Sequence, residues 1–461
     1  MDRFRWIFCQ LEVLRDCLPS SVRRTLNELP ESLDETYERI LKEVKKPNKD
    51  LARRVLQCLV VATRPLRVAE LAEILAVDFH DAEGIPRLNS DWRWEDQEQA
   101  LLIACSSLIA IVKAGDVEAS DSDSHVEAGD SWIVQFSHFS VKEFLTSSRL
   151  ATASGEVSNY YINLEPAHTI LAQACLGILL QIPHDVEGCT PGDHPLARYA
   201  AKHWTTHAQF GEVSSHLQKG IGYLFDANKP HFNVWLTLYD IDTYPSDDAA
   251  FAGFTPYPKS LAAPLYYAAL CGFHDLVKLL ITKYPQDVNT NGGYYVRPLV
   301  AALAGEHFRT ADLLRHNGAD TDVRGRSWTN PLHPAARSGN FKVTLKVIEY
   351  DPSCIHARDV DEWTPLHWAS TGHHFIDDSV LRLLLEHGSD INAQSVGGST
   401  PLHVGAVHWS PRVVRLLLEH GADVEVKNNL GETALEVAVA YGGHSEVVKL
   451  LHEHGASRNT L

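Results

Sequence analysis

The chain has 461 residues, of which 44% are hydrophobic and 22% are charged, values typical of globular rather than disordered proteins. The formal net charge of −18 argues against non-specific binding to nucleic acid, because so acidic a surface repels a phosphate backbone. The 8 cysteines form no CxxC pair, which argues against a disulfide scaffold and a cysteine zinc site. They indicate reduced thiols in an intracellular protein, cytoplasmic or nuclear.

Two long apolar runs are the candidates for a membrane segment. The run over 100–112 is shorter than the roughly 20 residues that a spanning helix needs. The run over 166–183 carries His168 and two glutamines between its end prolines. The N-terminus lacks the long apolar stretch and the small-residue cleavage site of a signal peptide. We therefore expect no membrane insertion, and we expect both runs to be buried in a core.

The first 49 residues predict a helical segment. Ser32 and Glu35 resemble a capping box, and the apolar residues that follow keep helical spacing. Two more helices are predicted within residues 50–77, separated by the Arg64-Pro65 step, because proline lacks the N–H that a helix interior needs.

A two-stranded ribbon is predicted after these helices. The stretches 106–112 and 132–140 are rich in β-branched residues. Residues 113–131 between them are acidic and nearly free of apolar side chains, which predicts a disordered loop. A further helix begins near residue 140. Helices followed by a ribbon with a long tip predict a winged-helix-like domain over residues 50–150.

The charge of this predicted domain bears on what it binds. Winged helices can bind DNA, but residues 50–149 hold more acidic than basic side chains, and the tip of the ribbon is acidic. We therefore expect no nucleic-acid partner. The tip also carries Ser120, Ser122 and Ser124, which fit either a solvated linker or, as a hypothesis, sites for an acid-directed kinase.

A pattern of about 33 residues recurs in the last part of the chain. Its anchor positions lie 33 to 36 residues apart, at Pro264, Pro298, Pro331, Pro365, Pro401 and Ala434. Strings such as TPLHWAS and TPLHVGA start the copies, and LLLEHGSD and LLLEHGAD end their second helices. Residues 259–461 thus resemble the ankyrin-repeat family, whose period and TPLH start they share. The fold class predicted is mainly α, an α-solenoid of six repeats after a helical connector over residues 151–258.

Each repeat position has a physical reason. Proline opens the first helix because its missing N–H needs no partner there, and Thr364 and Thr400 precede it as caps. Glycines at 272, 305, 339, 372 and 442 are expected to end this helix in a left-handed conformation. The ankyrin resemblance implies that the TPLH histidine bonds to the preceding threonine. Tyr266, Val300 and Glu436 replace that histidine, so these three copies are expected to be looser. Pro334 and Pro411, within helical stretches, are expected to cause local bends.

The N-terminal half carries a second resemblance. The strings FCQLEVLRDCLP, LNELPESLDETYERILKEV and IVQFSHFSVKEFLTSSRL, within residues 4–210, are similar to the region behind the nucleotidase domain in fungal NACHT-type proteins. In those proteins a P-loop domain comes first, then helical and winged-helix parts, then repeats. The resemblance implies a ligand-sensing switch, often in self/non-self recognition.

The phosphate-binding motif of that family is missing from this sequence. No GxxxxGK[ST] occurs, so neither the backbone cradle nor the lysine for the phosphates is present, and we expect no ATP hydrolysis by the family route. Two alternatives follow. The chain is a stand-alone derivative, or it is a truncated gene product whose nucleotide domain lies upstream.

Two clusters invite a chemical interpretation. His203 and His207 lie four residues apart, as in HExxH zinc sites, but the glutamate and a third ligand are missing. Residues 137–140 place hydroxyls beside a histidine, but neighbours in sequence are rarely a catalytic triad. We therefore predict no catalytic, cofactor or metal site.

Binding of a protein partner is the function that remains. Ankyrin stacks present hairpin tips and first helices as one concave surface. Large aromatic and arginine side chains dominate interfaces, which selects Arg324, Arg326, Trp328 and Trp363 as contact residues. Asp361, on the tip segment 358–363, is predicted as a contact residue with them. The sequence predicts a non-catalytic scaffold or adaptor. The alternative is the C-terminal part of a P-loop switch.

Overall fold

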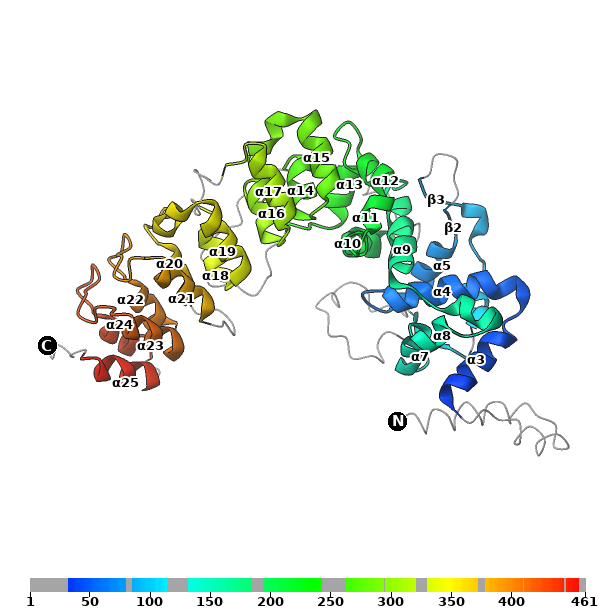
Figure 1. Cartoon of the computed structure of the whole chain (residues 1–461), viewed down its shortest axis with the longest axis horizontal. Coiled ribbons are helices and arrows are strands. Elements are labelled where there is room, and N and C mark those ends of the chain that lie inside the picture. The colour runs from blue at the N-terminus through cyan, green and yellow to red at the C-terminus, as the bar shows by residue number, and fades with distance from the viewer. Residues whose placement is uncertain are drawn as a thin grey trace. The chain divides into compact units, whose positions relative to one another are not determined.

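A computed structural model shows two compact units, Met1–Ile241 and Asp242–Leu461, which are described one at a time (Figure 1). The structure describes residues 32–79, 85–105, 107–113, 132–183, 194–242, 262–293, 295–320, 330–371, 378–408, 410–442 and 445–455. The predicted loop at 113–131 lies outside these ranges except for Lys113, as do residues 1–31 of the predicted first segment.

The first unit is mostly helical. Its first described helix, α3 (Leu33–Glu43), begins at Ser32, whose hydroxyl accepts a hydrogen bond from the N–H of Glu35 at 3.2 Å. The helices that follow are α4 (Lys49–Val61), α5 (Val68–Leu75), α6 (Gln97–Cys105), α7 (Phe139–Leu145), α8 (Ser148–Ala151), α9 (Leu164–Leu179), α10 (Ala197–Ala208), α11 (Val213–His216), α12 (Gln218–Leu224) and α13 (His231–Leu238). Short 3-10 turns lie at Lys46–Asn48, Ser90–Trp92 and Gly155–Tyr160.

The predicted ribbon is present and belongs to a three-stranded antiparallel sheet. β4 (Ile109–Lys113) pairs with β5 (Trp132–Phe136), so that Ile109 faces Phe136. β1 (Leu66–Arg67) adds to the other side of β5. A separate pair joins β2 (Val77–Asp78) to β3 (Arg87–Leu88). The two-residue strands escaped prediction because they are too short to show alternation.

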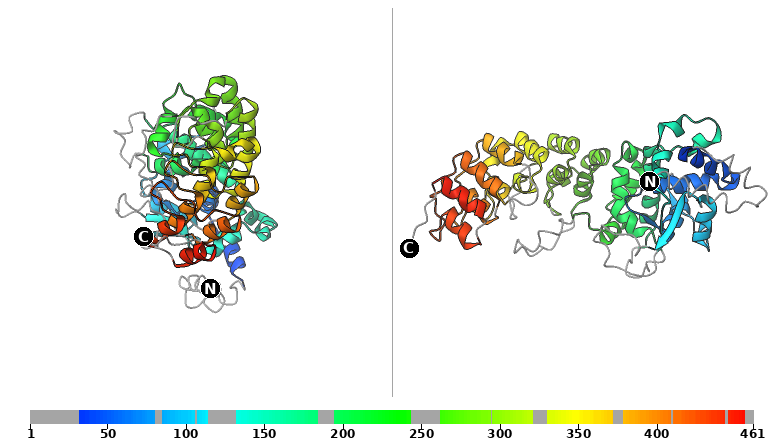
Figure 2. Two further views of the ribbon diagram at one scale, coloured as in Figure 1. Left: turned by 90° about the vertical axis from the view of Figure 1, so that its left-hand side faces the viewer. Right: turned by 90° about the horizontal axis from the view of Figure 1, so that it is seen from below.

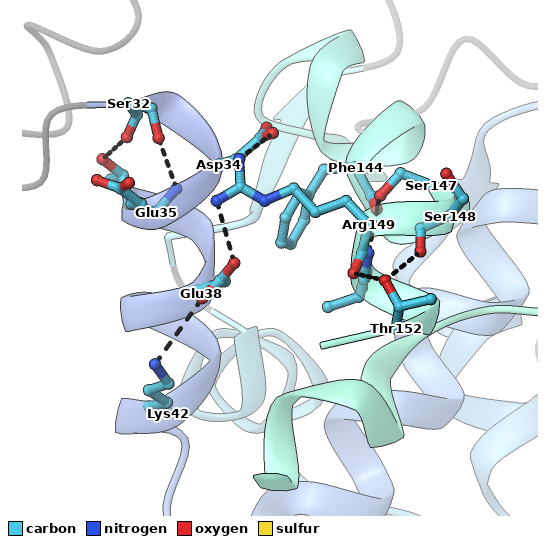
Figure 3. A network of polar contacts seen from close by, with 12 residues as sticks. Ser32, Asp34, Glu35, Glu38, Lys42, Phe144, Ser147, Ser148, Arg149 and Thr152 are labelled. Carbon is cyan, nitrogen blue, oxygen red and sulfur yellow. Dashed lines mark hydrogen bonds and ion pairs between the residues drawn. The ribbon is translucent and has the colours of Figure 1, made fainter. Parts of the chain in front are cut away.

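Polar contacts attach α3 to α7 and α8. Figure 3 shows Arg149 reaching from α8 toward two carboxylates of α3. Its Nη1 lies 3.0 Å from Asp34 Oδ2, and its Nη2 lies 3.3 Å from Glu38 Oε1. Deeper in this contact, the Tyr37 hydroxyl lies 2.9 Å from the Ser140 hydroxyl. The charged pairs are exposed, so the buried Tyr37 ring contributes most of this packing.

A buried carboxylate joins α5 to the start of α10. Glu73 is 3% exposed, and its Oε2 accepts a hydrogen bond from the N–H of Leu196 at 2.7 Å. Its Oε1 accepts one from Arg93 Nη2, also at 2.7 Å. A buried charge is tolerated only when its oxygens have such partners. Further along the connector, Trp204 and Trp235 pack edge to face in a buried aromatic cluster.

The second unit is a series of helix pairs, one pair for each repeat, visible in Figure 1 and in the right-hand view of Figure 2. The pairs are α14 (Pro264–Leu270) with α15 (His274–Lys283), α16 (Pro298–Ala304) with α17 (Phe308–His316), α18 (Leu332–Ser338) with α19 (Phe341–Tyr350), α20 (Pro365–Ala369) with α21 (Ser379–Glu386), α22 (Pro401–Val407) with α23 (Pro411–Glu419), and α24 (Ala434–Ala440) with α25 (Ser445–Glu453). The first helices pack together within two groups of neighbouring repeats: α14 packs on α16, and α18, α20, α22 and α24 pack on one another in order. The predicted α-solenoid is confirmed.

The glycines that end the first helices were expected to be left-handed, and Gly305 is an exception. Gly272, Gly339 and Gly442 have the expected positive φ. Gly305 does not: its φ is −80°, and Glu306 takes the left-handed conformation with φ of 57°. Glycine is needed at 305 for space instead, since a Cβ there would lie 2.7 Å from the carbonyl oxygen of Leu270. Gly372 lies outside the described residues.

The two prolines sit where a helix tolerates them. Pro334 occupies the third position of α18, within the first turn, where backbone N–H groups have no intrahelical acceptor. Pro411 is the first residue of α23. Each proline therefore lies in a first turn rather than in a helix interior.

Candidate protein-binding surface of the repeats

The TPLH turns of the fourth and fifth repeats are closed by a contact between threonine and histidine. The N–H and the hydroxyl of Thr364 both donate to Nδ1 of His367, at 3.1 and 2.8 Å. Thr400 and His403 repeat these contacts at 3.2 and 2.9 Å. Because Nδ1 accepts, the ring proton of each neutral histidine is on Nε2. The bond implied by the ankyrin resemblance is present in both turns.

The same histidines join neighbouring repeats. Nε2 of His367 donates to the carbonyl oxygen of Ser399 at 3.0 Å, and Nε2 of His403 donates to that of Glu432 at 3.1 Å. Both acceptors belong to the hairpin that opens the next repeat. Burial lowers the pKa of His367 to about 4 and also lowers the pKa of His403. Both rings are therefore neutral at physiological pH, as this bonding pattern requires.

The first repeat keeps these links without a histidine. The Tyr266 hydroxyl donates to Asp242 Oδ1 at 2.6 Å and accepts from the N–H of Tyr295, in the next repeat, at 3.0 Å. In the second repeat, Val300 packs against Val296 and Tyr295. In the first repeat the Tyr266 hydroxyl therefore supplies the bond to the following hairpin that a histidine supplies in the fourth and fifth repeats.

The sixth repeat also keeps a closed turn. Glu436 Oε2 accepts from the N–H of Thr433 at 2.8 Å and from its hydroxyl at 3.2 Å. In return, the N–H of Glu436 donates to the Thr433 hydroxyl at 3.4 Å. This is a capping box, which closes the turn without the threonine–histidine contact.

The third repeat differs because asparagine replaces the threonine. Nδ1 of His333 lies 3.2 Å from the carbonyl oxygen of Asn330, and its Nε2 lies 3.2 Å from that of Ala357. The Asn330 side chain caps α18 by accepting from the N–H of Leu332 at 2.9 Å. Burial lowers the pKa of His333.

A buried aspartate shapes the hairpin at residues 358–363. Oδ1 of Asp359 accepts from the N–H groups of Asp361 and Trp363 at 3.0 and 2.8 Å. Its Oδ2 accepts from the indole N–H of Trp368 at 2.8 Å. Burial raises the pKa of the Asp359 carboxyl, while these donors favour its charged form. One carboxylate thereby orients the hairpin backbone and a tryptophan of the adjoining helix.

Successive hairpin tips carry exposed aliphatic side chains. These are Val360, Val396 and Leu430, exposed by 61%, 61% and 83%. Backbone hydrogen bonds connect the tips: the N–H of Val396 donates to the carbonyl of Asp361 at 2.9 Å, and the N–H of Asn429 donates to that of Gly397 at 3.0 Å. The three apolar side chains therefore stand on one continuous, hydrogen-bonded edge.

The structure describes two of the five predicted contact residues. Asp361 is exposed and Trp363 is half-buried, and both lie on the 358–363 hairpin. Arg324, Arg326 and Trp328 lie outside the described residues. The aliphatic tips were missed by the sequence analysis, although a lone apolar residue in three successive polar loops is a readable signal.

The two clusters considered for chemistry have structural contacts. His207 is buried, with Nδ1 2.9 Å from Nδ1 of His168 and Nε2 2.9 Å from the Tyr199 hydroxyl. The His138 ring caps α7 by accepting from the N–H of Ser140 at 3.3 Å. Within the described ranges, no three histidine, cysteine or acidic side chains gather to hold a metal. None of the helices described there is long and apolar enough to cross a membrane.

Known protein families match two regions of the chain. Residues 298–395 and 377–460 match "Ankyrin repeats (3 copies)", and residues 37–155 match "GPI inositol-deacylase, winged helix domain". Both matches agree with the structure, in which these ranges hold helix pairs and a helical domain with a small sheet.

Curated relatives resemble parts of the chain. Azaphilone pigments biosynthesis cluster protein L of Monascus ruber is 30% identical over 310 residues, which cover 64% of this chain and 61% of that protein. Human inversin is 32% identical over 36% of this chain and 18% of its own length. Phosphocholine transferase AnkX of Legionella pneumophila is 28% identical over 25% of this chain and 13% of its own length. The chain thus spans less than two thirds of each of these relatives.

The chain thus carries ankyrin repeats over residues 298–460 and, ahead of them in the sequence, a winged-helix domain over residues 37–155.

Proposed function

We propose that this chain is a non-catalytic scaffold or adaptor, intracellular, which captures a protein partner along the hairpin tips and first helices of its ankyrin repeats. The main observation behind this proposal is the edge formed by the exposed side chains of Val360, Val396 and Leu430. Apolar side chains with 61% to 83% exposure on a hydrogen-bonded edge contribute little to folding. A partner that covers them would gain roughly 25 cal/mol for each Å² of apolar surface removed from water.

The test removes the apolar tips without disturbing the core. The full-length chain carrying Val396→Asp and Leu430→Asp is used as bait beside the unchanged chain, and captured proteins are quantified by mass spectrometry. A matched control carries Leu279→Asp and Phe341→Asp, two apolar side chains of second helices exposed by 57% and 41%. We expect partners lost from the tip variant and retained by the control. Equal capture by all three baits would contradict the proposal.

A second candidate is the C-terminal part of a P-loop switch in self/non-self recognition, with the nucleotide domain encoded upstream. The match of residues 37–155 to a winged-helix domain favours it. Genomic sequence ahead of Met1 that encodes an in-frame GxxxxGK[ST] would support this candidate. Nucleotide hydrolysis by the purified chain alone would overturn the non-catalytic assignment.

A further inference from the structure

Two tryptophans form an aromatic corner at the start of α20. The Trp363 and Trp368 rings have centroids 5.0 Å apart and are inclined by 52°. Trp363 also lies 5.6 Å from the His367 ring. Both tryptophans are half-buried, so part of each ring borders solvent beside the hairpin at 358–363.

The corner is held in place before any partner arrives. Asp359 accepts from the indole N–H of Trp368 at 2.8 Å and from the backbone N–H of Trp363 at 2.8 Å. The hairpin is closed by the N–H of Asp359, which donates to the carbonyl of Trp363 at 3.0 Å. A site fixed in advance loses little conformational entropy on binding.

The corner already lies against one cation of its own chain. The guanidinium carbon of Arg337, on α18, lies 5.4 Å from the centroid of the Trp368 ring. The faces of indole rings attract cations, most strongly among aromatic side chains. Trp363 offers a second indole in the same corner.

The hairpin that carries Trp363 also carries two exposed acidic residues. Asp361 and Glu362 are both exposed on the hairpin. Arg358 pairs with Glu362 at 3.2 Å, so that carboxylate is partly neutralised. Among the described residues, none forms an ion pair with the Asp361 carboxylate. With a net charge of −18 behind it, the corner complements a cation rather than an anion.

We propose that the aromatic corner of Trp363 and Trp368, together with the Asp361 carboxylate, binds a lysine or arginine side chain from a basic segment of the protein partner. This inference rests on the proposed function, since it names the chemistry of the partner that the repeats capture. The cationic group lies against the Trp363 ring and faces the Asp361 carboxylate, while neighbouring apolar residues of the partner reach the tips at Val360 and Val396. An arginine adds planar stacking on the indole, which a lysine does not provide.

The experiment measures binding of three fluorescein-labelled nonapeptides to the full-length chain by fluorescence anisotropy at physiological salt. The peptides alternate glycine with arginine, lysine or glutamate. We expect binding of the arginine and lysine peptides and none of the glutamate peptide. Two variants are compared with the unchanged chain: the single variant Trp363→Leu and the double variant Asp361→Asn with Glu362→Gln. The affinity of the two basic peptides should fall by roughly tenfold in each, because the first loses a cation–π contact and the second loses an ion-pair partner.

A charge-matched control separates this corner from general attraction to an acidic protein. The double variant Glu386→Gln with Glu419→Gln also removes two negative charges, but from exposed positions at the ends of α21 and α23. It should change affinity by less than about twofold at this ionic strength. Equal loss in both double variants, or unchanged binding by Trp363→Leu, overturns the proposal.

Folding and the proposed function are checked separately. Trp363→Phe keeps an aromatic face, so it should bind more tightly than Trp363→Leu with the same thermal unfolding midpoint. If the basic peptides fail to bind while the Val396 and Leu430 variant still loses its partner, the cation site is wrong and the scaffold function stands. If neither the peptide binding nor the capture of partners differs between the variants and the unchanged chain, the cation site and the scaffold function are both wrong.

Discussion

At the scale of single residues, buried histidines bind the repeats together through neutral rings. Nε2 of His367 donates across to the next repeat only because Nδ1 accepts from Thr364. A second proton, on Nδ1, would leave the backbone N–H of Thr364 without its acceptor and facing another donor. The bonding pattern of these turns is therefore a function of pH.

Acid should destabilise the repeats. The pKa of His367 drops from an ordinary value near 6.5 to about 4 on folding, because burial opposes its charge. Between these pH values the unfolded chain binds more protons than the folded one. The stabilisation is thus complete above about pH 6.5 and is lost as pH falls toward 4, by about 2 kcal/mol between pH 7 and 5.

Urea unfolding at pH 7 and pH 5 checks this expectation on the chain and on His367→Gln. The variant should be less stable at pH 7, because it loses the contact with Ser399, but its stability should vary less with pH. A pH dependence equal to that of the unchanged chain would contradict the assignment.

The described cysteines should be chemically inert in the folded chain. Burial raises the pKa of Cys58 and Cys105 to about 12 each, and it also raises the pKa values of Cys175, Cys271 and Cys354. The thiolate is the reactive form, and it is scarce at pH 7.5. Brief iodoacetamide treatment followed by peptide mapping should leave these five unmodified until denaturant is added. Rapid native labelling of Cys58 would show that α4 opens readily.

At the scale of elements, the sequence predicted the repeats and the ribbon of the first unit, and it missed the two-residue strands and the contacts made by single buried side chains. The helix pairs were predictable because each position recurs about every 33 residues with the same side-chain requirement. The role of Asp359 was not, because its donors come from its own hairpin and from Trp368, nine residues further on. Of the candidate surface, Trp363 could be selected by residue type and Asp361 by its place on a hairpin tip. The exposed tips required knowledge of which loop residues escape burial.

Removing the buried carboxylate of α5 should destabilise the first unit strongly. Glu73→Ala leaves the buried N–H of Leu196 without its acceptor and removes the partner of Arg93, which should cost about 2 to 4 kcal/mol. By comparison, Arg149→Ala breaks exposed ion pairs and should cost less than about 1 kcal/mol. Urea unfolding followed by circular dichroism measures both. A similar loss of unfolding free energy in the two variants would show that Glu73 does not stabilise the contact between α5 and the start of α10.

At the scale of the whole molecule, each compact unit has its own core. Trp204 and Trp235 lie in the core of the first unit, and Leu366 and Leu417 lie in the core of the second. We expect two cores of this kind to unfold as separate cooperative units. The division also places the winged-helix match and the ankyrin match in different units.

Calorimetry of the full chain should therefore show two transitions. Glu73→Ala should lower the midpoint of the transition of the first unit, and His367→Gln should lower that of the second unit. Each variant should have little effect on the transition of the other unit. A single transition displaced equally by both variants would indicate one cooperative unit instead.

The bridge from each TPLH histidine ends on a main-chain carbonyl, at Ser399 and at Glu432, and not on a side chain. Any hairpin in register can supply such an oxygen, whatever its sequence. The array can therefore lengthen or shorten by whole modules during evolution or by engineering, since excising residues 364–399 would bring Thr400 to the place of Thr364 with its own histidine and acceptor intact. Recognition can then diversify at the tips while the joints between modules stay the same.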